Sequence, residues 1–153
     1  MEQLRFREMF LELIENQDNR FHPLVWINGT PEIGEGTYIG GMSEVNAKGA
    51  RVKIGSWCDI ASFVAINCAD SHLLAIGVEG KATKRDIVIG DRVFVGSHCA
   101  ILGGSVIGER SVIAAGTVLR GETVPPASLA IGNPAVIKPG YYKERLAAQG
   151  INL

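Results

Sequence analysis

The sequence predicts an all-β chain wound into a parallel β-helix of hexapeptides, and two observations support that prediction. First, aliphatic residues recur at every sixth position in three blocks: Ile33, Ile39 and Val45; Ile54, Ile60 and Ile66; and Ile89, Val95, Ile101, Ile107, Ile113 and Leu119. Second, the residue after each of these is often Gly or Ala, and the fifth position is usually small. An α-helix would repeat near every 3.6 residues and an ordinary strand every two, so the period of six indicates a β-helix.

A second, longer period is superimposed on the six-residue period. At every third hexad within a block the second position is not small, as at Asn46, Asn67, Leu102, Arg120 and Lys138. Three hexads therefore make one coil of eighteen residues, triangular in section, and coils stack at roughly 4.8 Å. Pro125 stands where the next aliphatic residue is due, and the six-residue spacing of aliphatic residues resumes at Ile131 and Ile137. On this count Arg120 and Lys138 lie one above the other.

We expect a single domain over residues 1–153, because this length suits one core. Residues 1–20 are expected to cap the open end of the β-helix with a helix that begins at residue 2 and ends near residue 16. The apolar face of that helix consists of Leu4, Phe6, Met9, Phe10, Leu13 and Ile14.

Residues 72–86 break the period and are expected to loop out between coils, on a face that often binds ligands in solenoids. About three extra residues stand near Lys48, and Ile27 with Asn28 fits a partial opening coil. Near the end of the chain, a short helix is expected from Tyr141 to Gln149, with Gly150 as its stop.

Composition excludes several classes of protein. Hydrophobic residues make up 46% of the chain and charged residues 20%, which is typical of a soluble globular domain rather than a disordered one. The net charge of −1 gives no support for nucleic-acid binding. Residues 1–14 resemble neither a signal peptide nor a membrane span. Cys58, Cys68 and Cys99 suggest no pairing scheme, so a reducing cytoplasm is expected.

The interruption begins at His72, directly after Asn67-Cys68-Ala69-Asp70-Ser71. Asp70 stands where the period requires a small inward residue. Two interpretations follow: the coil ends here and Asp70 caps the loop, or a polar cluster is placed at a site.

The stretch IVIGDRVFVGSHCAILGGSVIGERSVIAAGTVLRGETVPPASLAIGNPAVIK, from Ile87 to Lys138, resembles the hexapeptide acyltransferase superfamily. Over residues 27–139 the chain is most similar to the galactoside, maltose and xenobiotic O-acetyltransferases, which show IGD-x-V-W-IG-S, I-x-AG-[ST]-V and a closing PP…GNPA. The resemblance implies a homotrimer of left-handed β-helices, with sites in clefts between neighbouring subunits. Outward candidates for the interface or for contacts with the coenzyme are Trp57, Phe63 and Phe94.

The same resemblance implies an acetyl-CoA-dependent acetyltransferase with His72 as general base, because the family's catalytic histidine stands just before such a loop. An imidazole suits the removal of a proton at neutral pH. Leu73 follows His72 where the sugar acetyltransferases typically have Pro, which leaves the acceptor open. His98 is the rival candidate. His22 is expected to be structural, and Cys68 to serve in packing.

Coenzyme binding is expected on the C-terminal coils, and no metal is expected. By resemblance, the positions are Phe94, Ser97, Ala115 and Thr117, with corner amides available to the pantetheine arm and the oxyanion. Coenzyme phosphates would pair with Arg120 and Lys138, although a solvated basic corner explains these two cations as well. Further options on the loop are Lys81, Lys84 and Arg85.

Asn67 and Asp70 are the candidates for substrate binding. The acceptor is expected to be a sugar, or an amino sugar carried on a nucleotide for surface polysaccharide, with O- and N-acetylation both open. Two other classes stay open. A γ-type carbonic anhydrase would need three histidines around zinc, and only His22, His72 and His98 exist, none near another in sequence. A non-catalytic scaffold would not need the loop.

Overall fold

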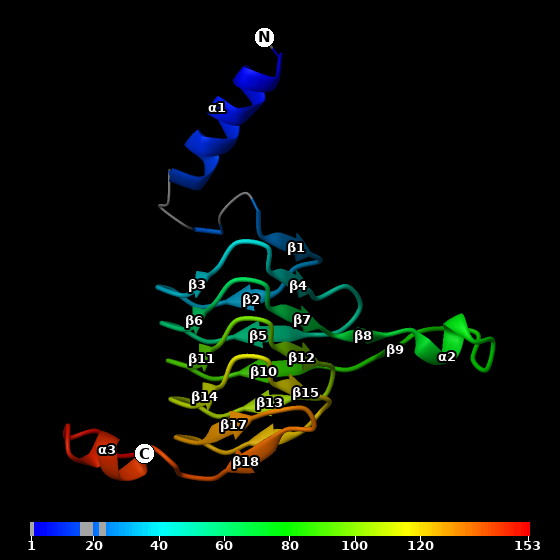
Figure 1. Cartoon of the computed structure of the whole chain (residues 1–153). Coiled ribbons are helices and arrows are strands. Elements are labelled where there is room, and N and C mark those ends of the chain that lie inside the picture. The colour runs from blue at the N-terminus through cyan, green and yellow to red at the C-terminus, as the bar shows by residue number, and fades with distance from the viewer. Residues whose placement is uncertain (1, 16–19, 22–23) are drawn as a thin grey trace.

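The computed structural model describes residues 2–15, 20–21 and 24–153. Short strands wind into a left-handed parallel β-helix, and the coils stack into a three-sided prism (Figure 1), as predicted. The first face consists of β1 (Trp26–Asn28), β4 (Glu44–Asn46), β7 (Ala65–Asn67), β12 (Ala100–Leu102) and β15 (Val118–Leu119). Ile27 pairs with Val45, so the expected partial opening coil is present.

The second face consists of β2 (Glu32–Ile33), β5 (Val52–Ile54), β10 (Ile87–Ile89), β13 (Val106–Ile107) and β16 (Thr123–Val124). The third consists of β3 (Tyr38–Ile39), β6 (Asp59–Ile60), β11 (Phe94–Val95), β14 (Val112–Ile113), β17 (Leu129–Ile131) and β18 (Val136–Lys138). We name the corner between the first and second faces the loop corner, the next the Arg92 corner, and the one returning to the first face the His98 corner.

The core is a narrow column of aliphatic side chains. Strand pairing sets Ile39 on Ile60, Ile60 on Val95, and Val95 on Ile113, in register. Each of these four side chains is fully buried. Because every coil adds one such residue to each face, the period of six in the sequence becomes three continuous columns inside the prism.

Small residues at the second hexad position are required by the approach of the next coil. A Cβ placed on Gly90 would lie 2.6 Å from the backbone nitrogen of Glu109, and one on Gly96 would lie 2.5 Å from that of Ala115. The left-handed backbone falls two residues later, at the fourth position, where Arg92 has φ of 53° and His98 has φ of 60°. At each corner, close packing against the next coil therefore falls on the second residue, and the left-handed backbone conformation falls on the fourth.

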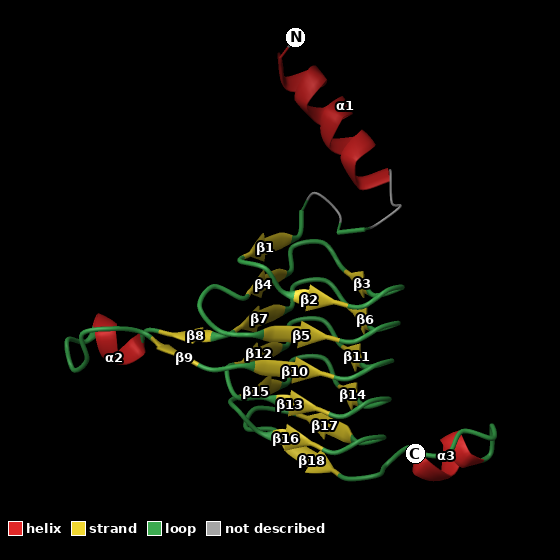
Figure 2. Ribbon diagram, turned by 180° about the vertical axis from the view of Figure 1, so that it is seen from behind, coloured by secondary structure: helices red, strands yellow, loops and turns green. Residues whose placement is uncertain are grey.

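The predicted interruption projects sideways from the prism (Figures 1 and 2). β8 (Ala69–Asp70) and β9 (Thr83–Lys84) pair as an antiparallel ribbon, and the short α2 (His72–Ala75) follows β8 directly. The ribbon raises the loop on a two-stranded stem, so the residues at its root stay at the surface of the coil.

The last coil departs from the predicted count. Val124 pairs with Ile107, and Ala130, rather than Ile131, occupies the buried column beside Ile113. The six-residue repeat is therefore shortened at the loop corner before Val124 and not at Pro125, because strand pairing with the neighbouring coil fixes the register. Ile131 is 44% exposed.

The chain then reverses through Gly132 and a cis Asn133–Pro134 bond, and β18 pairs antiparallel with β17. Lys138 therefore lies on the third face, beside the Tyr141 ring at 5.7 Å, while Arg120 lies at the loop corner. The predicted stack of Arg120 on Lys138 is wrong, because the last hexad folds back instead of starting another coil.

The two terminal helices are present. In Figure 1, α1 (Glu2–Glu15) stands beyond the first coil, and Leu4, Phe6 and Met9 are at least half exposed. The side chains of Leu13 and Ile14 lie outside the described residues. In the single chain, the described apolar side chains of α1 do not pack on the end coil as the expected cap would. The final helix α3 is shorter than predicted, spanning Lys143–Ala147. No helix within the described ranges is long and apolar enough to cross a membrane.

Candidate active site at the loop corner

A hollow of about 600 Å³ opens at the root of the loop. It combines the first residues of the loop, the return strand and the loop-corner residues of the two coils that follow. Its lining consists of Cys68, Ala69, Asp70, Ser71, His72, Thr83, Arg85, Leu102, Gly103 and Arg120. The hollow is open to solvent, so a substrate can enter it directly.

Asp70 and His72 form a dyad in this hollow. One Asp70 carboxylate oxygen, Oδ1, lies 2.5 Å from Nδ1 of His72 and also accepts the His72 backbone N–H at 3.1 Å. The turn from β8 into α2 brings the two side chains to the same side, because only Ser71 stands between them. A carboxylate at Nδ1 selects the tautomer that carries its proton there, which leaves Nε2 able to accept one.

The Asp70 carboxylate carries a negative charge in this dyad. Hydrogen bonds from the His72 ring and then from the His72 backbone N–H lower the pKa of Asp70. Asp70 therefore stays ionised at neutral pH and orients the ring. The predicted contact of Asp70 with the acceptor stays a prediction.

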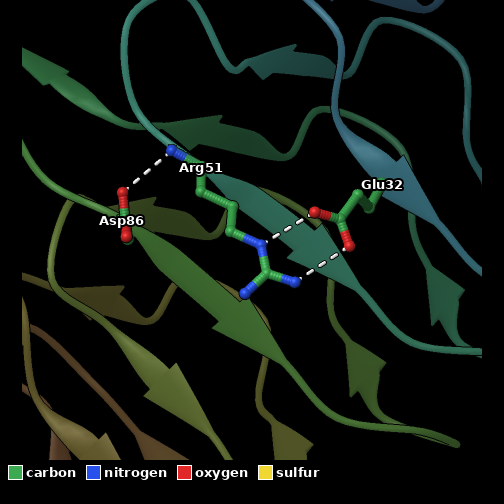
Figure 3. Close-up of polar contacts among 3 residues, drawn as sticks. All are labelled: Glu32, Arg51 and Asp86. Carbon is green, nitrogen blue, oxygen red and sulfur yellow. Dashed lines mark hydrogen bonds and ion pairs between the residues drawn. The ribbon is translucent and has the colours of Figure 1, made fainter.

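The return of the loop is fixed by the coils on both sides. The Arg85 N–H donates to the Cys68 carbonyl at 3.0 Å, and the Gly104 N–H donates to the Asp86 carbonyl at 2.8 Å. The Asp86 carboxylate accepts the Arg51 N–H at 2.8 Å, and the Arg51 guanidinium binds both carboxylate oxygens of Glu32, at 2.7 and 3.0 Å (Figure 3). The backbone that carries Arg85 is thus held in place, although the tip of the loop is exposed.

Arg120 lies in the same hollow as His72. Its Nη2 donates to the Asn133 side chain at 3.3 Å, and its backbone N–H donates to the Glu122 carboxylate. Of the two cations predicted to bind coenzyme phosphates, the structure places Arg120 in the hollow that the dyad also lines and Lys138 elsewhere. Arg85, which the sequence offered only as an option, joins Arg120 there.

Asn67 is occupied within the coil. Its Oδ1 accepts a hydrogen bond from the Asn46 side chain at 3.1 Å and another from the Ala69 N–H at 2.9 Å. This short asparagine ladder closes the loop corner of two successive coils. Asn67 does not line the hollow, and its contact with a substrate stays a prediction.

Apart from Arg120, the predicted coenzyme residues lie away from His72 within one chain. Ser97 and Ala115 are at the His98 corner, and Phe94 is on the third face. Thr117 is fully buried, and its hydroxyl donates to the Ala114 carbonyl at 2.6 Å. The Thr117 side chain is therefore committed to the core, and a coenzyme contact at this position stays a prediction.

Phe94 lines a second hollow, of about 330 Å³, between the Arg92 corner and α3. Three guanidinium groups share it, from Arg92, Arg110 and Arg145. Guanidinium groups suit phosphates because they can donate two parallel hydrogen bonds.

The rival histidine and the cysteines do not enter the hollow as reactive groups. His98 stacks on Phe63 with ring centroids 5.0 Å apart, at a different corner from His72. Burial raises the pKa of the Cys58 and Cys99 thiols, which keeps them neutral. Cys68 is buried at the floor of the hollow, consistent with packing.

Within the ranges that the structure describes, no group of three His, Cys, Asp or Glu side chains is placed to hold a metal ion. His72 and His98 stand at different corners, so they do not share an ion within one chain. His22, the third histidine, lies outside the described residues.

Comparison with known proteins gives the repeat a family description. A family model for the bacterial transferase hexapeptide, with six repeats, matches residues 86–121. The bifunctional protein GlmU of Streptococcus equi subsp. zooepidemicus is 32% identical over 129 residues, which is 79% of this chain. The match takes in 27% of that relative, so the chain spans about a quarter of its length. The predicted resemblance to hexapeptide-repeat transferases is confirmed.

Two solved structures share the fold over most of the chain. The polySia-specific acetyltransferase NeuO is 30% identical with a TM-score of 0.62, covering 76% of this chain and 61% of that one. The hexapeptide-repeat acetyltransferase VCA0836 of Vibrio cholerae O1 biovar eltor, solved with acetyl coenzyme A, is 25% identical with a TM-score of 0.56. That match covers 86% of this chain and 82% of the other.

Proposed function

We propose that this chain, whose coils carry the bacterial transferase hexapeptide repeat, is an acetyl-CoA-dependent acetyltransferase with His72 as its general base. The observation that supports it most is the Asp70–His72 pair, 2.5 Å apart, at the root of the loop in an open hollow. A non-catalytic scaffold gives no reason for an oriented imidazole there. The acetyl-CoA complex of the similar VCA0836 supports the donor.

The dyad suits direct transfer. An acceptor hydroxyl or amine gives its proton to Nε2 of His72 as its oxygen or nitrogen attacks the thioester carbonyl carbon. The C–S bond of the tetrahedral intermediate then breaks, and the departing thiolate takes the proton from the imidazolium. The ionised Asp70 stabilises the imidazolium between these two steps and holds the orientation of the ring. No covalent intermediate with the protein is needed, which agrees with the buried cysteines.

The separation of the proposed coenzyme residues from His72 supports a trimer. Phe94, Ser97 and Ala115 lie on the third face and at the His98 corner, and His72 lies at the loop corner. One chain therefore carries the base on one edge and the coenzyme residues on another. A closed ring of three brings the edge of one subunit against the edge of the next. The exposed Trp57, Phe63 and Phe94 are available for burial in that ring.

The acceptor is proposed to be a sugar or a nucleotide-linked amino sugar. The name of NeuO gives polysialic acid as the target of that similar protein, which favours a carbohydrate for this one. The three free cysteines, all buried, support a reducing cytoplasm as its location.

A thiol-release assay tests the proposal. Purified protein is mixed with acetyl-CoA and a panel of sugars, amino sugars and nucleotide-linked amino sugars, and free coenzyme A is measured with a thiol reagent. We expect release with at least one carbohydrate and saturable binding of acetyl-CoA by calorimetry. If acetyl-CoA does not bind, the proposed activity is wrong and the scaffold is favoured.

A further inference from the structure

Two guanidinium groups enter the hollow that holds the His72 dyad, from parts of the chain that are far apart in sequence. Arg85 comes from the return of the loop, and Arg120 follows β15 at the loop corner. The Arg85 guanidinium has no hydrogen bond or ion pair with any residue that the structure describes. The Arg120 guanidinium has one hydrogen bond, to the neutral Asn133 amide at 3.3 Å. Most of their donors are therefore available to a ligand.

The Arg85 guanidinium lies close to two glycines of the coil. A Cβ on Gly104 would lie 3.3 Å from Arg85 Nη1, and one on Gly121 would lie 3.4 Å from the same atom. Gly104 has φ of 94° and Gly121 has φ of 111°, in the region that side chains disfavour. With the Arg85 backbone bonded to Cys68, the guanidinium lies across two successive coils at the corner that carries Arg120.

The nearby acids do not cancel these charges fully. Asp70 accepts the His72 ring and backbone N–H groups, and Glu122 accepts the backbone N–H of Arg120 from outside the lining of the hollow. Neither carboxylate forms an ion pair with Arg85 or Arg120 within the described residues. Two unpaired guanidinium groups in one hollow attract an anion, and their planar donors suit carboxylate and phosphate oxygens.

We infer that Arg85 and Arg120 bind an anionic group of the acceptor, a carboxylate or a phosphate, beside the base. This inference rests on the proposed function. The coenzyme also carries phosphates, but these stand at the opposite end of the pantetheine arm from the thioester. Because the thioester must reach Nε2 of His72, cations in the same hollow as His72 are too near the reacting carbonyl to hold those phosphates. Arg120 is thereby reassigned from the coenzyme to the acceptor.

The test uses two pairs of carbohydrates that differ in charge. Glucuronic acid is compared with glucose for the carboxylate, and UDP-N-acetylglucosamine with N-acetylglucosamine for the phosphates. Binding to the full chain is measured by calorimetry without coenzyme, so the result does not depend on turnover. The variants are Arg85→Gln and Arg120→Gln. The control is Lys81→Gln, which removes an exposed cation of the same loop that does not line the hollow.

We expect wild type to bind at least one anionic compound about tenfold more tightly than its neutral partner, with the pair that shows the difference identifying the anion. Each arginine variant should lose about tenfold in that affinity, and Lys81→Gln should keep it. The affinity for acetyl-CoA should be unchanged in all three variants. Equal affinity for charged and neutral partners, or no binding of any anion at millimolar concentration, overturns the inference.

If instead the arginine variants weaken acetyl-CoA as much as the anion, the two side chains hold the coenzyme and the inference is wrong. Either failure leaves the proposed acetyltransferase standing, because that activity is judged by thiol release from acetyl-CoA. If instead wild type neither binds acetyl-CoA nor releases thiol from it, the proposed function is wrong. Arg85→Gln is the safer of the two variants, because Arg120 also contacts Asn133.

Discussion

The loop corner and the other two corners of the prism grow from the same hexapeptide but differ from coil to coil. At the Arg92 and His98 corners, successive coils repeat a small second residue and a left-handed fourth residue, as in Gly90 to Arg92 and Gly96 to His98. At the loop corner, one coil has extra residues near Lys48, and the next coil is interrupted by the loop at 72–86. A later coil is shortened before Val124. The regular corners therefore stack the coils, and the irregular corner carries the proposed active site.

The difference follows from what each corner touches. At the second position of a regular corner, a Cβ on Gly90 or Gly96 would lie about 2.5 Å from the next coil, so only a very small residue fits there. The loop corner opens outward, and insertions there leave the buried columns intact on both sides. The Asp70–His72 dyad, Arg85 and Arg120 all gather at this one edge.

The largest expected effect contrasts the two histidines. His72→Ala should lower kcat on the order of 100-fold or more, because it removes the base from the loop corner. His98→Ala, at a regular corner, should cost far less. Steady-state thiol release from acetyl-CoA measures both, with circular dichroism as the check on folding. Unchanged turnover in His72→Ala would remove His72 from the mechanism.

The second prediction contrasts two glycines. Gly90→Ala should lower the free energy of unfolding by about 1–3 kcal/mol, because its Cβ would stand 2.6 Å from the Glu109 backbone nitrogen. Gly80→Ala, on the loop with nothing within 4 Å, should leave stability unchanged or raise it by at most about 1 kcal/mol. Urea unfolding followed by circular dichroism measures both. Equal midpoints for the two variants would show that close stacking is not what selects glycine at regular corners.

The smallest effect concerns the orientation of His72. Asp70→Asn should lower kcat by about tenfold, because the amide no longer holds the Nδ1 proton in place. The pKa of Asp70 is lowered in the fold by the His72 hydrogen bonds. Its carboxylate therefore adds stability above its unfolded pKa of about 3.9, and this addition is lost as the pH falls through the lower folded value.

The difference in unfolding free energy between wild type and Asp70→Asn should thus be present at neutral pH and should shrink as the pH falls below about 4 toward the lowered pKa of Asp70. Glu79→Gln, an exposed acid of the same loop, is the matched control and should show no such change. A difference that persists unchanged below the folded pKa would mean that Asp70 acts through packing and not through its charge.

Much of the fold could be predicted from the residues because the repeat is local. Each coil carries its own aliphatic and small positions, so Ile89 to Leu119 could be assigned to strands and corners one hexad at a time. His72 could be singled out because it stands where the repeat stops. The role of Asp70 could not be predicted from its hexad position, since the turn that aims it at His72 forms only with the ribbon of β8 and β9.

By itself, the sequence determined the six-residue period, the place of the interruption and the candidate base, since these depend on neighbours along the chain. Only the tertiary structure decided that Ala130 and not Ile131 enters the core, and that Arg120 joins Arg85 while Lys138 turns away. The physical reason is that each coil takes its register from hydrogen bonds to the coil beneath it. A single residue lost at a corner moves every later side chain to a new position, and its place becomes visible only when the coils are stacked.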